Sequence, residues 1–250
     1  MKYILVLLLV LSTLNAAESK QKVTIGAGPY FQTQPYKDAQ TIFIPSPVIF
    51  FDNSLFYVRW SRAGVYFLGD KKDNYMWGFS VTAQPRPNGY KASDSPYLTG
   101  MDTRENTLEG GLAFSAQYDD IYIEVMALTD LLDRYDSWIL KTEIGNKYSL
   151  GDFSFYPSLI IVYQSDKFVD YYYGIKESEV ATSRYTSAYN PKGGFQLGAQ
   201  TYINYPITDN WAALVNIRAD KISQDSANSP LVDKEYIYSG LVSLIYTFEY

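Results

Sequence analysis

The side chains that carry most enzyme chemistry are missing from this sequence: its 250 residues include no histidine and no cysteine. General acid–base catalysis uses histidine most often, and activated serine or cysteine nucleophiles need such a base beside them. Pairs of carboxylates could still act as in glycosidases. However, Asp119/Asp120 reads as a tight turn, and Glu105/Glu109 runs from a loop into a strand. We therefore predict no catalytic residues, no cofactor and no enzymatic activity.

Metal binding is restricted in the same way, because only oxygen ligands remain and Ca²⁺ is then the one serious candidate. Asp225, Asp233 and Glu235 cluster in one segment without the spacing of an EF-hand loop. An acidic loop in contact with water explains them, so we predict no metal site.

Charged residues on the polar side of alternating segments are the best candidates for function. If the apolar sides contact lipid, these residues point into the interior, since Lys or Arg facing lipid near the midplane costs about 2–4 kcal/mol. They either pair with one another and plug the interior, or line a narrow pore. The predicted lumen-facing residues are Glu109, Glu124, Lys141, Glu143, Lys147, Arg218 and Asp220.

The segments that carry these charges have the period of a β-strand. In 121–130, for example, Ile121, Ile123 and Val125 alternate with polar residues such as Glu124. Successive side chains of a strand point to opposite faces, so each segment has one apolar and one polar face. A soluble sandwich would show the same alternation. These segments run to about ten residues, the length of a tilted transmembrane strand.

Aromatic residues stand at the ends of these segments, on the apolar side. Their rings suit the headgroup level of a membrane, where the body of the ring is in lipid and the polar tip is in water. The predicted aromatic girdle consists of Tyr118, Trp138, Tyr148, Tyr205, Trp211, Tyr236 and Tyr250. The last segment alternates Tyr246, Phe248 and Tyr250, a terminal strand of the kind that barrel-assembly machinery recognises.

Short and long connections alternate along the chain, as in bacterial outer-membrane barrels. The short turns are 52–53, 69–74, 119–120, 151–152 and 206–210, and the long loops are 85–104, 131–137, 165–193 and 222–235. About twelve strands result, provided that 55–68 is two short strands with a turn at 61–64. Within one long loop, 171–174 is interpreted as an extension of a strand.

The chain ends and the composition complete the prediction. Residues 1–17 have the layout of a secretory signal peptide, with a positive start, an apolar run and small polar residues. A net charge of −6 disfavours nucleic acid as a partner. We predict an all-β protein in which residues 18–250 form an antiparallel transmembrane β-barrel of the bacterial outer membrane, with short periplasmic turns and longer extracellular loops.

Several short motifs, in order along the chain, resemble the MipA/OmpV family of outer-membrane proteins. They are Gly26-Ala27-Gly28-Pro29-Tyr30, Leu98-Thr99-Gly100-Met101 with Arg104, Glu109-Gly110-Gly111, Asp170-Tyr171-Tyr172-Tyr173-Gly174-Ile175, Arg184 and Tyr185, Gly193-Gly194, Asp225-Ser226, Ser229-Pro230-Leu231-Val232 and Tyr246-Thr247-Phe248. The pair Ala227-Asn228 departs from the family pattern by interrupting a compact Asp-Ser-Pro turn.

The resemblance implies an outer-membrane barrel without catalytic residues. One branch of the family is named for interaction with a lytic transglycosylase, which implies a scaffold between a murein hydrolase and a murein synthase. Another branch is described as porin-like, so a narrow channel for small solutes is the alternative. A soluble periplasmic protein that binds a ligand through its tyrosines is a third possibility. If the protein is a scaffold or a channel, we expect outer-membrane lipid to surround the barrel.

Overall fold

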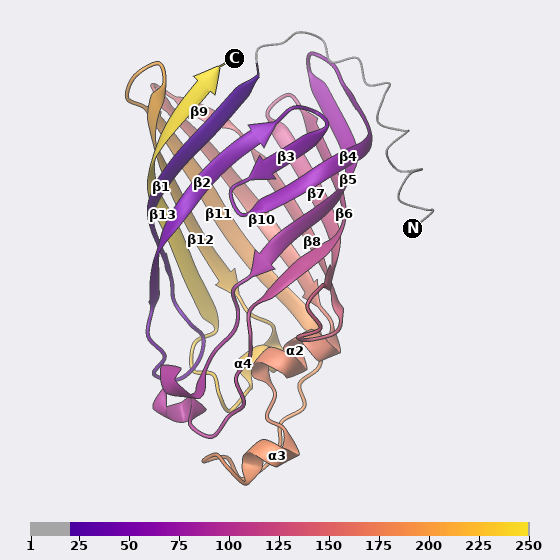
Figure 1. Ribbon diagram of the computed structural model, residues 1–250, viewed down its shortest axis with the longest axis vertical. Coiled ribbons are helices and arrows are strands. Elements are labelled where there is room, and N and C mark those ends of the chain that lie inside the picture. Colours follow the sequence, from indigo (N-terminus) through magenta and orange to yellow (C-terminus); the bar gives the residue numbers. More distant parts are fainter. Residues whose placement is uncertain (1–20, 250) are drawn as a thin grey trace, which may run out of the picture.

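Antiparallel strands form a closed wall in the computed structural model, which describes residues 21–249 (Figure 1). The strands are β1 (Lys22–Gln32), β2 (Ile42–Asp52), β3 (Phe56–Arg59), β4 (Arg62–Lys71), β5 (Tyr75–Arg86), β6 (Thr107–Tyr118), β7 (Ile121–Asp130), β8 (Trp138–Asn146), β9 (Tyr148–Leu150), β10 (Phe153–Gln164), β11 (Gly194–Pro206), β12 (Trp211–Lys221) and β13 (Tyr236–Glu249). The predicted signal peptide, 1–17, and the girdle residue Tyr250 lie outside the described residues.

The wall closes where the first strand pairs with the last, with Val23 opposite Phe248. Every other strand pairs with its neighbour in the chain, except that β8 and β9 both pair with β10. They are one strand interrupted at Lys147, so the barrel has the twelve strands that the sequence predicts. The even number places both ends of the barrel on the side of the short turns, at the top of Figure 1.

Proline explains the interruption between β8 and β9. The register of β10 carries Pro157 opposite Asn146, between the pairs Ser158–Gly145 and Phe155–Tyr148. The amide of Lys147 donates to Asp120 O on the β7 side, so the groups of Asn146 face β10. Pro157 has no N–H to donate, and the ladder is broken at that point.

The ambiguous segment 55–68 is indeed two strands, β3 and β4. The turn falls at Trp60 and Ser61, slightly before the predicted 61–64. The prediction of two short strands was wrong for β4, which has ten residues, whereas β3 has four. The turn therefore lies part-way down the wall, and β3 does not span it.

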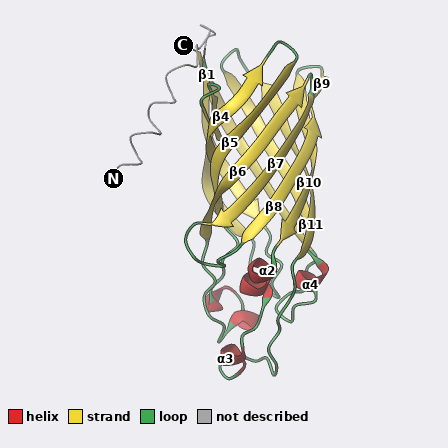
Figure 2. Cartoon of the chain, turned by 90° about the vertical axis from the view of Figure 1, so that its right-hand side faces the viewer, coloured by secondary structure: helices red, strands yellow, loops and turns green. Residues whose placement is uncertain are grey.

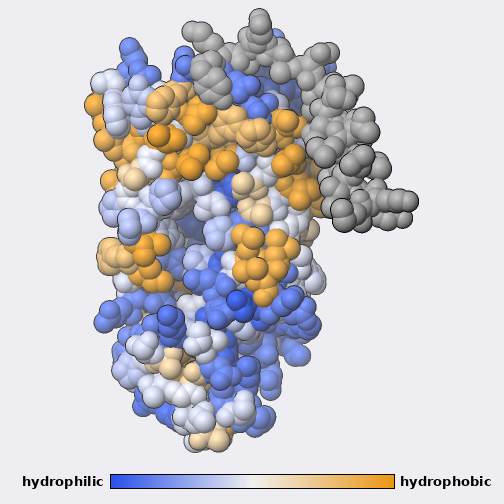
Figure 3. All heavy atoms as spheres, viewed as in Figure 1, coloured by the Kyte–Doolittle hydropathy of each residue, from blue (hydrophilic) through white to orange (hydrophobic). Residues whose placement is uncertain are grey.

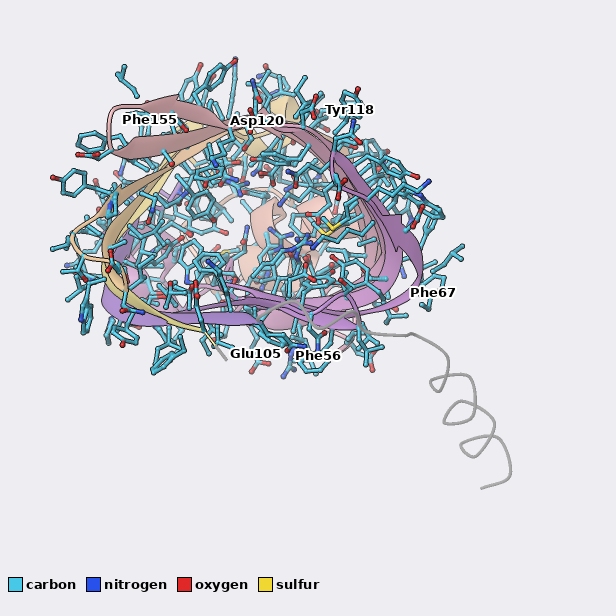
Figure 4. The ribbon with its side chains drawn as sticks, turned by 90° about the horizontal axis from the view of Figure 1, so that it is seen from above. Phe56, Phe67, Glu105, Tyr118, Asp120 and Phe155 are labelled. Atoms are coloured by element: carbon cyan, nitrogen blue, oxygen red, sulfur yellow. The ribbon has the colours of Figure 1, made fainter. Side chains whose placement is uncertain are left out.

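Alternating side chains give the wall an outer apolar face and an inner polar face. On β6, Leu112 is 56% exposed outside, whereas Glu109 is fully buried inside. Exposed apolar residues surround the barrel, and Figure 3 shows them as a hydrophobic belt over one face. Seen along the axis, side chains fill the interior, while Phe67 and Tyr118 point outward (Figure 4).

Five loop segments gather at the end opposite the short turns, and we call them the cap: 33–41, 87–106, 131–137, 165–193 and 222–235. They contain the 3₁₀ turns η2 (Ala92–Asp94) and η3 (Pro96–Leu98) and the helices α2 (Asp166–Tyr173), α3 (Glu177–Val180) and α4 (Gln224–Ala227). Figure 2 shows these helices beyond the ends of the strands. The sequence analysis missed the first segment, 33–41.

One prediction about the cap was wrong, because 171–174 does not extend a strand. Tyr171 to Tyr173 end helix α2, and Gly174 is its C-cap. Ser165 begins the helix by accepting a hydrogen bond from the amide of Phe168, which is the usual role of an N-cap serine. The buried residues Phe168, Val169, Tyr172 and Tyr173 follow a helical spacing.

Candidate functional site

The inward charges of the barrel form local networks, and the largest surrounds Glu124 on β7. Arg59 Nη1 donates to Glu124 Oε1 at 2.9 Å, and Arg62 bonds both carboxylate oxygens, with Nη2–Oε1 at 2.7 Å. Ser115 Oγ donates to the same carboxylate. Arg59 also reaches Asp52 at the turn end, 3.2 Å away. Glu124 is therefore fully paired.

A second network holds Glu109 beneath the cap. Arg86 donates to both carboxylate oxygens, from Nε and Nη2, each at 2.8 Å. Gln84 Nε2 on the neighbouring strand and Tyr135 Oη from the cap donate at 2.9 and 3.0 Å. A bidentate arginine is the strongest common partner of a carboxylate. The Tyr135 bond connects this network to the cap.

Two further networks lie on β8, where Glu143 stands directly opposite Glu124 of β7, and on β12. Glu143 contacts Lys141 Nζ at 3.2 Å and accepts from Ser158 and Gln200. Asp220 accepts two bonds from Arg218, at 2.6 and 2.7 Å. The four central carboxylates of these networks are at most 11% exposed. Charges that line a wide aqueous pore would be wetter, so the arrangement is a packed polar interior.

An apolar cluster fills the remaining part of the interior, toward the turn end. Val48, Leu214, Leu241 and Ile245 are buried there, and Trp60 packs against them. Tyr30 meets the Trp60 ring edge-on, with the ring centroids 5.6 Å apart. Ionic networks and apolar contacts together fill the barrel.

The cap has a core of its own, which lies over the mouth of the barrel. Its buried aromatic residues include Tyr36, Tyr90, Phe168, Tyr172 and Tyr173. Tyr36 Oη donates to Tyr172 O at 3.1 Å, and its ring lies 4.7 Å from that of Tyr90, centroid to centroid. Segments far apart in the sequence are held together in this way, and the mouth is covered.

A buried ion pair joins two segments of the cap, 87–106 and 165–193. Arg104 donates from Nη1 and Nη2 to the two oxygens of Glu179, at 2.8 and 3.0 Å, and both side chains are 1% exposed. The Glu179 carboxylate also accepts from the amides of Asp102 and Lys176. Burial alone would raise the pKa of Glu179, but the hydrogen bonds from Arg104 and the two amides lower it.

The structure places most of the predicted lumen residues in these networks. Glu109, Glu124, Lys141, Glu143, Arg218 and Asp220 face inward, and each has a partner of opposite charge. Lys147 differs: it lies at the interruption between β8 and β9, at the turn end, and is exposed. The sequence analysis missed Arg59, Arg62 and Arg86, although their inward register follows from the same alternation.

The predicted girdle residues lie at both ends of the wall. Trp138 and Tyr236 are at the cap end, and the other described members are at the turn end, namely Tyr118, Tyr148, Tyr205 and Trp211. All six are exposed, from 39% for Tyr205 to 60% for Tyr118. Trp211 packs edge-on against Tyr246 of the last strand, at 4.9 Å between centroids.

The carboxylates considered for chemistry have other partners. Glu105 pairs with Arg134 at 2.6 Å, whereas Glu109 is bound inside the barrel. Asp119 has a positive φ of 50° in a tight turn. Asp225 accepts from the amide of Lys192. Within residues 21–249, no group of three or more acidic residues is arranged to hold a metal ion.

Most of the motifs that resemble the family lie in the cap, and those at 26–30, 109–111 and 246–248 lie in strands β1, β6 and β13. Leu98 and Met101 are buried in the cap core, Arg104 forms the buried ion pair, and 170–175 comprises the second half of helix α2 and the two residues after it. Ala227-Asn228, the departure from the family pattern, ends helix α4. Most of the shared residues therefore build the cap.

Comparison with known proteins decides the family. The model of the family described as "MltA-interacting protein MipA" matches residues 25–248. The chain belongs to this family. The MltA-interacting protein of Escherichia coli K12 is 27% identical over 97% of this chain and 96% of its own length. The putative outer membrane protein YiaT of the same strain is 24% identical over 93% and 94%.

Among solved structures, an outer membrane channel from Pseudomonas putida F1 is similar over 96% of this chain and 98% of its own. The sequence identity is 10% and the TM-score 0.44. The fold and the relatives together identify this MipA-family chain as an outer-membrane β-barrel. Among the described residues, no helix is long and apolar enough to cross a membrane.

Proposed function

We propose that the protein is a non-enzymatic scaffold, which holds a murein-remodelling enzyme at the inner surface of the outer membrane. One observation carries the proposal: the inward charges are paired with one another beneath a packed cap. This arrangement supports a plugged barrel over a channel for solutes. Outer-membrane barrels place their short turns in the periplasm. The turn end is then the surface available to a periplasmic partner.

The relative from Escherichia coli named MltA-interacting protein supports a partner of this class. A lytic transglycosylase and a murein synthase are the partners that we propose. Outer-membrane lipid surrounds the apolar face, and the last strand, β13, directs assembly. The paired carboxylates support the absence of catalysis, since each is already engaged by a cation. No nucleic acid is involved.

Binding is tested with tagged, detergent-extracted protein and a lytic transglycosylase of the same bacterium. The variant D152K/D209K reverses two exposed charges of the turn end. Its matched control, E177K/D233K, makes the same charge change in the cap. We expect the turn-end variant alone to retain less enzyme. If the wild-type protein retains no more transglycosylase than an unrelated barrel does, the proposal is wrong.

Planar-bilayer recording tests the alternative, a narrow channel. We expect the folded wild-type protein to give no discrete conductance steps, because ion pairs and the apolar cluster fill the interior. Steps that persist at the same size in several preparations would favour the channel over the scaffold.

A further inference from the structure

The barrel wall is incomplete on one side. β3 pairs with β2 only at 50–52, and the last bond in this direction runs from Trp60 N to Ile49 O, 2.8 Å. β4 follows β5 no farther than Ala83. Among the described strands, residues 42–48 of β2 therefore pair only with β1, and 84–86 of β5 only with β6. Figure 1 shows β10 and β11 of the far wall between these two edges.

Proline occupies the facing positions of both edges. Main-chain groups alternate sides along a strand. Since Ile49 O faces β3, the groups of Pro45 and Pro47 face the same side. Leu108 O accepts from Leu131 N on the β7 side, so Pro85, opposite Leu108, turns away from β6 and toward the opening. These positions have no N–H, which makes the edges poor templates for an added strand.

The β2 side of the opening is apolar and leads to the apolar cluster, whereas on the β5 side Gln84 and Arg86 face inward and bind Glu109. Ile44 lies opposite Tyr30 and so faces inward, yet it is 49% exposed. Phe43, on the outer side of β2, is 73% exposed. Tyr30 belongs to the apolar cluster inside the barrel. In the space-filling view, hydrophilic residues interrupt the hydrophobic belt on this face (Figure 3).

The turn of the β3–β4 hairpin forms one border of the opening. Trp60 has a φ of 58°, an unusual value for a bulky residue, and its Nε1 donates to Ser46 Oγ at 3.0 Å. This bond joins the hairpin to the free edge of β2. The Trp60 ring packs in the interior cluster.

We propose that an acyl chain of an outer-membrane lipid enters this opening and packs against the interior cluster beside Trp60. Hydrocarbon needs no hydrogen bonds, and it suits the rim of Phe43, Pro45 and Pro47 better than a polypeptide strand does. The opening lies in the lipid-facing wall, on the cap side of the hairpin, so membrane lipid is in direct contact with it. The proposal is independent of the scaffold function.

Quenching by brominated acyl chains tests it, because the chain has only four tryptophans. Replacing Trp77, Trp138 and Trp211 with Phe leaves Trp60 as the single reporter. We expect bilayers of phospholipid with brominated acyl chains to quench Trp60 nearly as strongly as outward-facing Trp138 in its own single-tryptophan protein. A single tryptophan introduced by Tyr122→Trp, on the inner face of β7, is the interior reference and should be quenched least.

Ile44→Asp places a carboxylate in the opening and should reduce the quenching of Trp60, whereas Ile44→Leu should preserve it. A heat-modifiable band on a detergent gel first shows that each variant is folded. The comparison of the three reporters does not depend on the Ile44 variants. Quenching of Trp60 no stronger than that of the interior reference would overturn the proposal.

A second copy of the chain is the competing occupant. Pro45→Cys introduces the single cysteine of the chain. A disulfide-linked dimer in bilayers, together with an unquenched Trp60, would show that another copy covers the opening and would reject the lipid. We expect a monomer and a quenched Trp60.

Discussion

The barrel interior and the cap both bury ion pairs, but they assemble them differently. Inside the barrel, some partners share a strand, as with Arg218 and Asp220 on β12, and others meet across the lumen, as with Arg62 of β4 and Glu124 of β7. In the cap, Arg104 and Glu179 come from different loops and are 75 residues apart. The interior arginines keep an exposure of 11% to 28%, whereas the cap pair keeps 1%. Strand alternation turns the barrel residues toward a common interior, whereas only the packing of irregular loops brings the cap pair together.

The largest difference in stability between the cap and the barrel should come from breaking the Arg104–Glu179 pair. Glu179→Gln leaves the Arg104 charge buried without its counter-charge, which costs about 3–5 kcal/mol. We expect amide hydrogen exchange to accelerate in 87–106 and 165–193 but not in the strands. As control, Arg104→Met with Glu179→Leu removes both charges and should retain most of the protection. Equal exchange in Glu179→Gln and wild type would refute the prediction.

Acid should weaken the same bond in the wild-type protein. The pKa of Glu179 is lowered from 4.5, so the stability it contributes is present above that value and is lost as the pH falls through the lowered pKa. Protease cleavage of the cap should therefore increase below about pH 4.5. The doubly uncharged variant should show a weaker pH response. If its response equals that of wild type, Glu179 is not the responsible group.

Breaking an interior pair should cost less, because the arginines there are less completely buried and one of them has other partners. In Glu124→Gln, Arg59 retains Asp52 and Tyr66. We expect a loss of about 1–3 kcal/mol, measured as a lower midpoint for the heat-induced band shift on a detergent gel. Ser115→Ala removes one neutral donor to the same carboxylate and should cost about 0.5–1.5 kcal/mol. If Glu124→Gln lowers the stability of the barrel as much as Glu179→Gln lowers that of the cap, the expected order of the two effects is wrong.

The start of helix α2 provides a smaller local effect in the cap. Ser165→Ala removes the side-chain acceptor of the Phe168 amide and should destabilise the helix by about 1 kcal/mol. Faster hydrogen exchange confined to 166–173 is the expected result. Ser165→Asp retains an acceptor and should recover the protection. Uniform acceleration over the whole cap would indicate that the helix is not an independent unit.

The smallest effect should come from an exposed pair of the cap. Lys167 and Asp136 are 2.8 Å apart, but their side chains are 64% and 77% exposed. Lys167→Ala should change the stability of the cap by less than about 1 kcal/mol, and added salt should make the change smaller still. A change like that of Glu179→Gln would show that proximity, and not burial, determines the strength of these pairs.

The sequence predicts the barrel well, since each strand shows which side faces lipid. The same alternation identifies Glu109, Glu124 and Asp220 as inward residues without any knowledge of their partners. It does not predict the Arg104–Glu179 pair, because side chains in loops do not alternate in direction with a regular period. Nor did it reveal helix α2, since three consecutive tyrosines suit a strand as well as a helix. The signal that was overlooked is Ser165, an N-cap residue directly before Asp166.

Main-chain contacts join the first and last segments of the cap, 33–41 and 222–235, and they constrain the order of folding. Tyr36 pairs with Val232, and the amide of Lys37 donates to Leu231 O at 2.9 Å. These contacts join segments that are far apart in the sequence, and contacts of such long sequence separation form slowly. They should therefore form only after β13 has reached β1. An antibody that recognises this junction would then distinguish finished molecules from those still being inserted.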